Sequence, residues 1–363
     1  MSWNSLKLLK LKLFGSIFFI IFFSSMISAC SPLSIRDGKE IKPITKTNFI
    51  MGSLVKITVY DEDIDESVFS QVFNRIQEIE NKMTINKVTP QGEIIKLNNS
   101  AGHDFVELSG ETFFILEKGK YYGEITQGKF DITIGPIVKL WNIDTENAAI
   151  PDGEEIIQKL PLVDYRKLEL DQEQKKAKLS EEGMMVDLGA IAKGYAADEA
   201  AKILIDAGIK HAIINLGGNI LTIGSKPDGS LFRLGLQDPF QERNINMAVV
   251  RLNNQSLVSS GTYEKFFEAN GKKYHHIIDP KTGYPVENEL VSVSIITEKS
   301  IDADALSTSV FLLGLEKGMD LVEKLPNTEA VFVTSAKKVF VSSGINKDIF
   351  ELVNEDYQLE LKR

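Results

Sequence analysis

Two acids and three hydroxyls lie close together in the stretch DADALSTSVFLLG, residues 302–314, directly before an apolar run. If a helix starts near Asp302, then Asp304 and Thr308 are one turn apart, so a carboxylate and a hydroxyl share one face. Two hard oxygen donors in this arrangement suit Mg²⁺ or Ca²⁺. Aspartates are also typical of a helix N-terminus, where they accept free backbone N–H groups, and Gly314 is typical of a helix end. The stretch predicts a helix start, a metal site, or both.

A second candidate site lies in VDLGAIAKGYAAD, residues 186–198. Asp187 ends an apolar strand-like run, Gly189 permits a tight turn, and a helix follows with Lys193 in its first turns. A helix start offers free N–H groups and partial positive charge, which favour phosphate binding. The segment is not a Walker A loop, because the spacing differs and no Ser or Thr follows the lysine. The alternative is a plain glycine turn with an exposed lysine.

Two of the four histidines occur in HHIIDPKTGYP, residues 275–285. The DPKTG portion has the composition of a turn. His276 or Asp279 could act as a general base, since histidine transfers protons near neutral pH. A purely structural histidine beside a turn is the alternative.

Two weaker patterns complete the candidates. NLGGN, residues 215–219, interrupts a strand with Gly217 and Gly218, where a backbone can approach a flat ligand or form a bulge. FDIT, residues 130–133, carries an acid, Asp131, and a hydroxyl, Thr133, on what would be a strand.

The first 29 residues have the pattern of an export signal. Three lysines, at positions 7, 10 and 12, precede the apolar run LFGSIFFIIFFSSMI, and ISAC then ends at Cys30. This pattern is similar to a bacterial lipoprotein signal, which predicts a lipidated Cys30 and a location in the cell envelope, anchored to the membrane. An uncleaved transmembrane anchor is the alternative, although the run is short for a span.

Charge and cysteine content exclude several classes of protein. The net charge is −10, and removal of the three lysines of the signal takes it to −13. An acidic body argues against nucleic-acid binding. A phosphate-bearing substrate would need local neutralisation, for which a metal ion is the obvious candidate. Because Cys30 is the only cysteine, the folded body has no intramolecular disulfide and no cysteine nucleophile.

The elements that must position these residues are both strands and helices. Alternation predicts a strand over 54–61, helical spacing predicts an amphipathic helix over 66–84, and 167–180 has the pattern of a hairpin. These patterns favour an α+β fold: a single large mixed α/β unit of mainly antiparallel sheets with helices, in one body or two lobes. We expect a signal at 1–29, a tether at 30–48 and the folded domain at 49–350.

Six stretches together resemble, in order, the motifs of the ApbE family of flavin transferases. They are MGS, GKFDITIGPIVKLW, VDLGAIAKGYAADEA, NLGGN, HIIDPKTGYP and DADALSTSVFLLG. The resemblance spans roughly residues 49–345, and many members of the family are lipoproteins of the cell envelope.

The resemblance implies a set of site residues. Asp304 and Thr308 would be side-chain ligands of Mg²⁺, with Ala190 contributing a backbone carbonyl. His276 matches the histidine proposed as a base in the family. One departure is visible, because Asn86 stands where the family usually carries an aromatic residue. The positions that match the lining of the flavin site are Met51, Asn86, Phe130, Asp131, Ile132, Asp187, Lys193 and Ile277.

The resemblance also implies a reaction. FMN would pass from FAD to a threonine hydroxyl of an acceptor flavoprotein, such as an Rnf- or Nqr-type redox subunit, with release of AMP. His276 or Asp279 would take the hydroxyl proton. Two alternatives stay open: an FAD-hydrolysing or flavin-binding lipoprotein without an acceptor, and a solute-binding lipoprotein without catalysis.

Overall fold

The computed structural model describes residues 34–36, 39–143 and 145–360. The expected signal and Cys30 lie outside the described residues, so lipidation stays a prediction. Within the described part, no helix combines the length and apolar character that a membrane crossing needs. The described residues belong to one compact unit, so the two-lobed form of the expectation does not apply.

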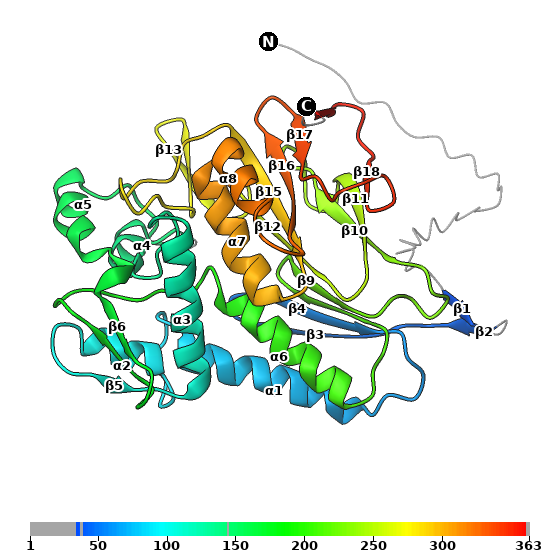
Figure 1. Ribbon diagram of the computed structural model, residues 1–363, viewed down its shortest axis with the longest axis horizontal. Helices are drawn as coiled ribbons and strands as arrows, with labels where there is room; N and C mark the ends of the chain where they lie inside the picture. The colour runs from blue at the N-terminus through cyan, green and yellow to red at the C-terminus, as the bar shows by residue number, and fades with distance from the viewer. Residues whose placement is uncertain (1–33, 37–38, 144, 361–363) are drawn as a thin grey trace, which may run out of the picture. The chain divides into compact units, whose positions relative to one another are not determined.

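The largest sheet of the described chain has nine strands, in the order β19-β17-β16-β15-β12-β9-β8-β4-β3 (Figure 1). Neighbouring strands are antiparallel except β17 and β19, which confirms the mainly antiparallel architecture. The bounds are β3 (Ile44–Ile50), β4 (Ser53–Val59), β8 (Ala212–Leu216), β9 (Asn219–Ile223), β12 (Ser256–Gly261), β15 (Leu290–Thr297), β16 (Glu329–Thr334), β17 (Lys338–Val341) and β19 (Gln358–Glu360).

The sheet extends past both expected limits of the domain, 49 and 350. β3 begins at Ile44, inside the expected tether, because all seven of its residues pair with β4. Two shorter strands, β1 (Ser34–Arg36) and β2 (Lys39–Ile41), pair with each other in the same segment. At the other end, β19 pairs with β17.

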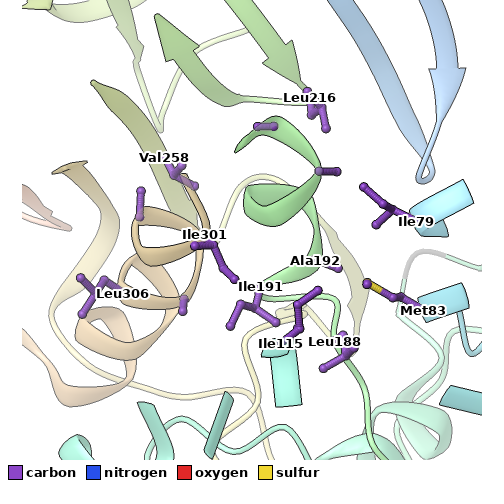
Figure 2. Packing of buried hydrophobic residues seen from close by; sticks show 14 of the residues in the cluster. Ile79, Met83, Ile115, Leu188, Ile191, Ala192, Leu216, Val258, Ile301 and Leu306 are labelled. Carbon is purple, nitrogen blue, oxygen red and sulfur yellow. The ribbon is translucent and has the colours of Figure 1, made fainter. Parts of the chain in front are cut away.

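Three helices cover one face of the sheet: α1 (Glu66–Met83), α6 (Ala192–Asp206) and α7 (Ser300–Leu313) (Figure 1). The predicted amphipathic helix is confirmed as α1, whose apolar residues at helical spacing are buried. Figure 2 shows Ile79 and Met83 of α1 on one side of α6 and Ile301 of α7 on the other. α8 (Leu315–Val322) follows α7 after Gly314, which ends the helix as predicted.

A second sheet covers the opposite face. It consists of β10 (Phe232–Gln237), β11 (Asn246–Leu252) and β18 (Phe350–Leu352). Alternation in the central strands serves the two layers: in β12, Leu257 packs with this second sheet, whereas Val258 packs with the helices. Because both faces are covered, β15 is buried along nearly its whole length.

A third group of elements flanks these layers. It contains α2 (Glu93–Asn99), α3 (Gly110–Ile125), α4 (Gly135–Trp141), α5 (Gly153–Lys159) and the short 3₁₀ helices Leu160–Leu162 and Tyr165–Lys167. A three-stranded sheet joins β5 (Val106–Glu107), β7 (Lys176–Leu179) and β6 (Leu168–Asp171), and the predicted hairpin is β6–β7. A separate hairpin joins β13 (Phe266–Ala269) and β14 (Lys272–His275).

Two local expectations were wrong. Residues 130–133 are a turn and not a strand, because the Asp131 carboxylate accepts both the N–H and the hydroxyl of Thr133, at 2.8 and 2.7 Å. Gly217 and Gly218 do not form a bulge. They are the two-residue turn of the β8–β9 hairpin, with φ of 59° and 97°, a conformation that glycine adopts at little cost.

Candidate active site

The starts of helices α6 and α7 meet and cap each other. The buried carboxylate of Asp304 on α7 accepts the N–H of Gly194 on α6 at 2.8 Å. In return, Asp198 of α6 accepts the N–H groups of Ser300 and Ile301 at 2.9 and 3.0 Å. Gly194 permits this approach, because a Cβ there would lie 2.2 Å from the carbonyl oxygen of Ser300. The contact fixes the Asp304 carboxylate at the positive end of α6.

Asp304 and Thr308 lie one turn apart on α7, as the sequence predicts. Burial raises the pKa of Asp304, and Lys193 with the backbone N–H groups at the α6 start opposes that rise. The hydrogen-bond partner of the carboxylate is thus a backbone N–H and not a cationic side chain. Ser260 of β12 lies near Thr308, with 3.4 Å between the two hydroxyl oxygens.

The other acid of the stretch, Asp302, faces α3. Its Oδ1 accepts hydrogen bonds from Lys118 Nζ at 2.8 Å and from the Tyr122 hydroxyl at 2.7 Å. Because Asp198 already caps the start of α7, neither Asp302 nor Asp304 caps its own helix. The two acids instead connect α7 to two different helices, α3 and α6.

An oxygen donor set is what these residues offer to a cation. Within the described residues, no group of three or more His, Cys, Asp and Glu side chains could hold a metal ion. The donors here are the carboxylate of Asp304 and the hydroxyl of Thr308, while Ala190 lies in the turn before α6 and carries a backbone carbonyl. Such donors fit a hard cation, Mg²⁺ or Ca²⁺, and not a soft transition metal.

The turn before α6 joins two of the sequence motifs. The Asp187 N–H donates to the carbonyl of Ile132 at 2.7 Å, and the Asp187 carboxylate accepts the Gly189 N–H at 2.8 Å. Burial raises the pKa of Asp187, and the positive charges of Lys139 and Lys265 oppose that rise. The strand expected before Asp187 is reduced to an isolated bridge between residues 134 and 185. Lys193 lies at the second position of α6, as predicted.

Three residues matched to flavin-lining positions have side chains in the protein interior. Phe130 and Ile132 are each 2% exposed. The second oxygen of Asp131 accepts the N–H of Tyr165 at 2.8 Å, so both of its carboxylate oxygens have partners within the protein. Burial raises the pKa of this acid. These side chains thus pack within the protein, while the carbonyl of Ile132 accepts the N–H of Asp187 in the turn before α6.

The remaining flavin-matched positions lie in turns. Asn86 is exposed after α1 and accepts a hydrogen bond from Lys139 Nζ at 2.7 Å. Met51 lies in the β3–β4 turn with φ of 55°, a conformation uncommon for residues other than glycine and asparagine. This turn lies against the β8–β9 turn, since a Cβ at Gly217 would be 2.5 Å from the Ser53 Cβ. The structure thus brings together two turns that the sequence separates by about 160 residues.

His276 directly follows β14 and is held by one backbone carbonyl. The oxygen of Lys265 accepts the His276 N–H at 3.1 Å and lies 3.2 Å from Nδ1. Because a carbonyl only accepts, we assign the ring proton to Nδ1, which leaves Nε2 as a proton acceptor. The His276 side chain is exposed, and desolvation by the surrounding protein, with the charges of Lys265, His275 and Lys193, lowers the pKa of the ring from its usual 6.5. The adjacent Ile277 is buried and its N–H lies 3.3 Å from His275 Nδ1.

The other candidate base, Asp279, has partners on both carboxylate oxygens. Lys129 Nζ donates to Oδ2 at 2.6 Å, and the Lys281 N–H donates to Oδ1 at 2.9 Å. Of the two candidates, the geometry favours His276 as the proton acceptor.

Sequence reasoning missed three lysines around these residues: Lys129, Lys139 and Lys265. The first two lie within the motif GKFDITIGPIVKLW, so the pattern identified the segment without showing which side chains turn toward the site. No spacing relates Lys129 to Asp279 or Lys139 to Asp187, because these residues lie in segments far apart in the chain. Lys265 lies 11 residues before His276, across the β13–β14 hairpin.

The architecture matches solved flavin transferase structures. The ApbE protein of Thermotoga maritima aligns with a TM-score of 0.76 and 28% identity, over 83% of this chain and 97% of that one. The flavin transferase ApbE of Vibrio cholerae shares the fold, with a TM-score of 0.75 and 23% identity over 84% of this chain and 98% of that one.

Sequence comparison identifies the family. The model of the ApbE family matches residues 51–332. An FAD:protein FMN transferase of Klebsiella pneumoniae (strain 342) is 36% identical over 294 residues, which cover 81% of this chain and 90% of that protein. One of Treponema pallidum (strain Nichols) is 33% identical over 332 residues, covering 87% and 91%. The chain belongs to the ApbE family, which confirms the resemblance seen in the motifs.

Proposed function

We propose that the protein is an FAD:protein FMN transferase, which moves FMN from FAD to a threonine hydroxyl of an acceptor flavoprotein. One observation carries the proposal for this family member: the carboxylate of Asp304 is buried at the start of α6, one turn from the Thr308 hydroxyl, beside Lys193. Burial disfavours the negative charge of a carboxylate, and a bound cation offsets this cost. Phosphate groups of a substrate would bind the same cation.

The residues present fit Mg²⁺. Asp304 and Thr308 would hold the ion through side-chain oxygens, and Ala190 through its carbonyl. When bound, Mg²⁺ neutralises charge on the pyrophosphate of FAD and on the leaving phosphate. Lys193 adds a positive charge near the same point, as the lowering effect of this lysine on the pKa of Asp304 indicates. In a chain with a net charge of −10, this local positive charge is needed to bind a substrate that carries a pyrophosphate.

His276 supplies the proton acceptor. The hydroxyl oxygen of the acceptor threonine forms a bond to the phosphorus of the FMN half, and the bond between that phosphorus and the bridging oxygen breaks. The hydroxyl proton passes to Nε2 of the neutral His276 ring, whose orientation is fixed by the Lys265 carbonyl. AMP leaves with the bridging oxygen, and FMN stays on the acceptor as a phosphoester.

The export signal supports a proposal for the location of the protein. The ISAC box supports attachment of the mature protein to the membrane through lipidated Cys30, in the cell envelope. An acceptor at the membrane, such as an Rnf- or Nqr-type redox subunit, fits that location.

A direct assay tests the proposal. The mature protein is incubated with FAD, Mg²⁺ and an acceptor domain bearing a threonine, and the acceptor is weighed by mass spectrometry. We expect a gain of one FMN minus water, with one AMP released, and no gain in EDTA. AMP release without any acceptor labelling would identify FAD hydrolysis instead, and FAD binding indifferent to metal with no AMP released would identify a binding protein.

A further inference from the structure

We propose that Lys129 is a positioning residue, and that its ion pair with Asp279 holds the segment carrying His276 against residues 130–133, which contact the turn before α6. The kinetic part of this inference rests on the proposed function. The structural part concerns FAD binding and does not depend on transfer.

The ion pair is short and shielded from water. Lys129 Nζ lies 2.6 Å from Asp279 Oδ2, and the two side chains are 24% and 10% exposed. Loss of one partner from a shielded pair leaves the other charge poorly solvated, so such pairs matter more than exposed ones. Lys129 immediately precedes Phe130, and Asp279 follows His276 by three residues. The pair thus joins residues 129–133 to the segment that carries His276.

The turn that contains Asp279 is held together by backbone hydrogen bonds. The carbonyl of Asp279 accepts the N–H of Gly283 at 2.8 Å, and its own N–H donates to the carbonyl of Tyr284 at 2.8 Å. The Val286 N–H donates to the carbonyl of Ile277 at 3.0 Å, which connects the turn to the residue beside His276. A shift of Asp279 is therefore transmitted to His276.

The motif of residues 128–141, which contains Lys129, contacts this turn at a second point. Trp141, at the end of α4, donates its indole N–H to the carbonyl of Gly283 at 2.7 Å. Lys129 and Trp141, near the two ends of the motif GKFDITIGPIVKLW, thus both bind the turn that contains Asp279. Trp141 is buried among aromatic side chains and fixes the far end, which leaves the Lys129 pair to set the spacing near His276.

Removal of the pair should act on substrate binding more than on the chemical step. Without Lys129 the Asp279 carboxylate has no cationic partner in this contact, and the turn will shift toward water. We expect Lys129→Met to raise the Kd and KM for FAD about tenfold and to lower kcat less than tenfold, because the segment that shifts carries Ile277, a position matched to the lining of the flavin site, next to His276. Loss of a general base, in contrast, costs about 10²–10⁴-fold in kcat.

The experiment is a double-mutant cycle in the full chain. Lys129→Met, Asp279→Asn and the double variant are compared by FAD affinity, from quenching of flavin fluorescence, and by kcat, KM and the pH profile of transfer. The swap Lys129→Asp with Asp279→Lys tests rescue, and Lys129→Arg keeps the charge if Lys129→Met folds poorly. Lys337→Met is the matched control, because Lys337 is 34% exposed and pairs with Asp356 at 2.9 Å beside the turn between β16 and β17. Thermal unfolding checks each variant.

The outcomes separate the roles. The proposal predicts that the FAD affinity of the double variant equals that of the single variant that binds FAD less tightly, and that the charge swap recovers affinity. It also predicts that the rise in transfer rate with pH that is due to His276 persists in Asp279→Asn. Unchanged affinity in Lys129→Met, or losses that simply add, would overturn it. A 10²-fold fall in kcat with loss of that rise with pH in Asp279→Asn would make Asp279 the base. If the wild type transfers no FMN, the proposed function fails, and the affinity cycle still decides the role of the pair.

Discussion

Asn and Ala at position 304 should have different effects, because the Asp304 carboxylate has two separable roles. It accepts the Gly194 N–H at 2.8 Å, and it supplies negative charge beside Thr308. Asp304→Asn keeps an oxygen that can accept the N–H and removes the charge. Asp304→Ala removes both. We therefore expect both variants to lose metal-dependent transfer, while only Asp304→Ala loses substantial stability.

The magnitudes follow from these contacts. In Asp304→Ala the Gly194 N–H loses its acceptor in a buried place, which costs about 1–3 kcal/mol. For a folded body of this size we expect a fall in Tm of a few degrees, at about 2–4 °C per kcal/mol. The loss of a charged metal ligand should lower transfer about 10³-fold or more, equivalent to about 4 kcal/mol of transition-state stabilisation.

The pH dependence gives the sign of the charge effect. Burial raises the pKa of Asp304 above its ordinary value of 3.8. In metal-free protein the contribution of this group to the free energy of unfolding is therefore fully present below pH 3.8, and it is lost as the pH rises through the raised pKa. The free energy of unfolding of the wild type should thus fall relative to that of Asp304→Asn as pH rises over this window. Mg²⁺ should reverse the difference at neutral pH, since it binds the charged form.

The assay compares AMP release and acceptor labelling over a Mg²⁺ titration, with thermal unfolding in parallel. Asp302→Asn is the matched control, because Asp302 binds Lys118 and Tyr122 of α3 and an asparagine oxygen can still accept from both. Its partly exposed ion pair is worth less than about 1 kcal/mol. The reasoning fails if Asp304→Asn keeps wild-type Mg²⁺ dependence, or if the two asparagine variants lose transfer equally.

Three further outcomes can be checked. His276→Ala should bind FAD nearly normally and transfer FMN about 10²–10⁴-fold more slowly. Because the surrounding protein lowers the pKa of His276, the wild-type rate should rise as pH passes through that lowered pKa and should show no inflection at 6.5. Gly194→Ala should lower the free energy of unfolding by about 1–3 kcal/mol and weaken Mg²⁺ binding, because its Cβ would press the Ser300 carbonyl oxygen, whereas Gly110→Ala has open space and should be tolerated in a Tm and calorimetric titration. Cys30→Ala should abolish lipid labelling and signal processing; a mature, lipid-labelled variant would exclude the anchor.

The sequence by itself determined the class of fold, the family and most of the segments of the site. Alternation and helical spacing depend on contacts within one element, so α1, β4 and the one-turn pair Asp304 and Thr308 could be predicted. The order of the six motifs identified the ApbE family because these motifs are spread over nearly the whole folded domain. Lys193 at the start of α6 was predictable for the same local reason.

Tertiary structure alone decided what each side chain contacts. Asp302 and Asp304 are two residues apart and indistinguishable by type, yet one faces Tyr122 and the other Gly194, because successive helical positions point toward different neighbours. Asp131 is an acid within a motif matched to the flavin site, yet its carboxylate oxygens accept hydrogen bonds from the N–H groups of Thr133 and Tyr165 within the protein. The pair of Lys129 and Asp279 joins positions 150 residues apart, and no local pattern encodes a contact that only chain packing creates.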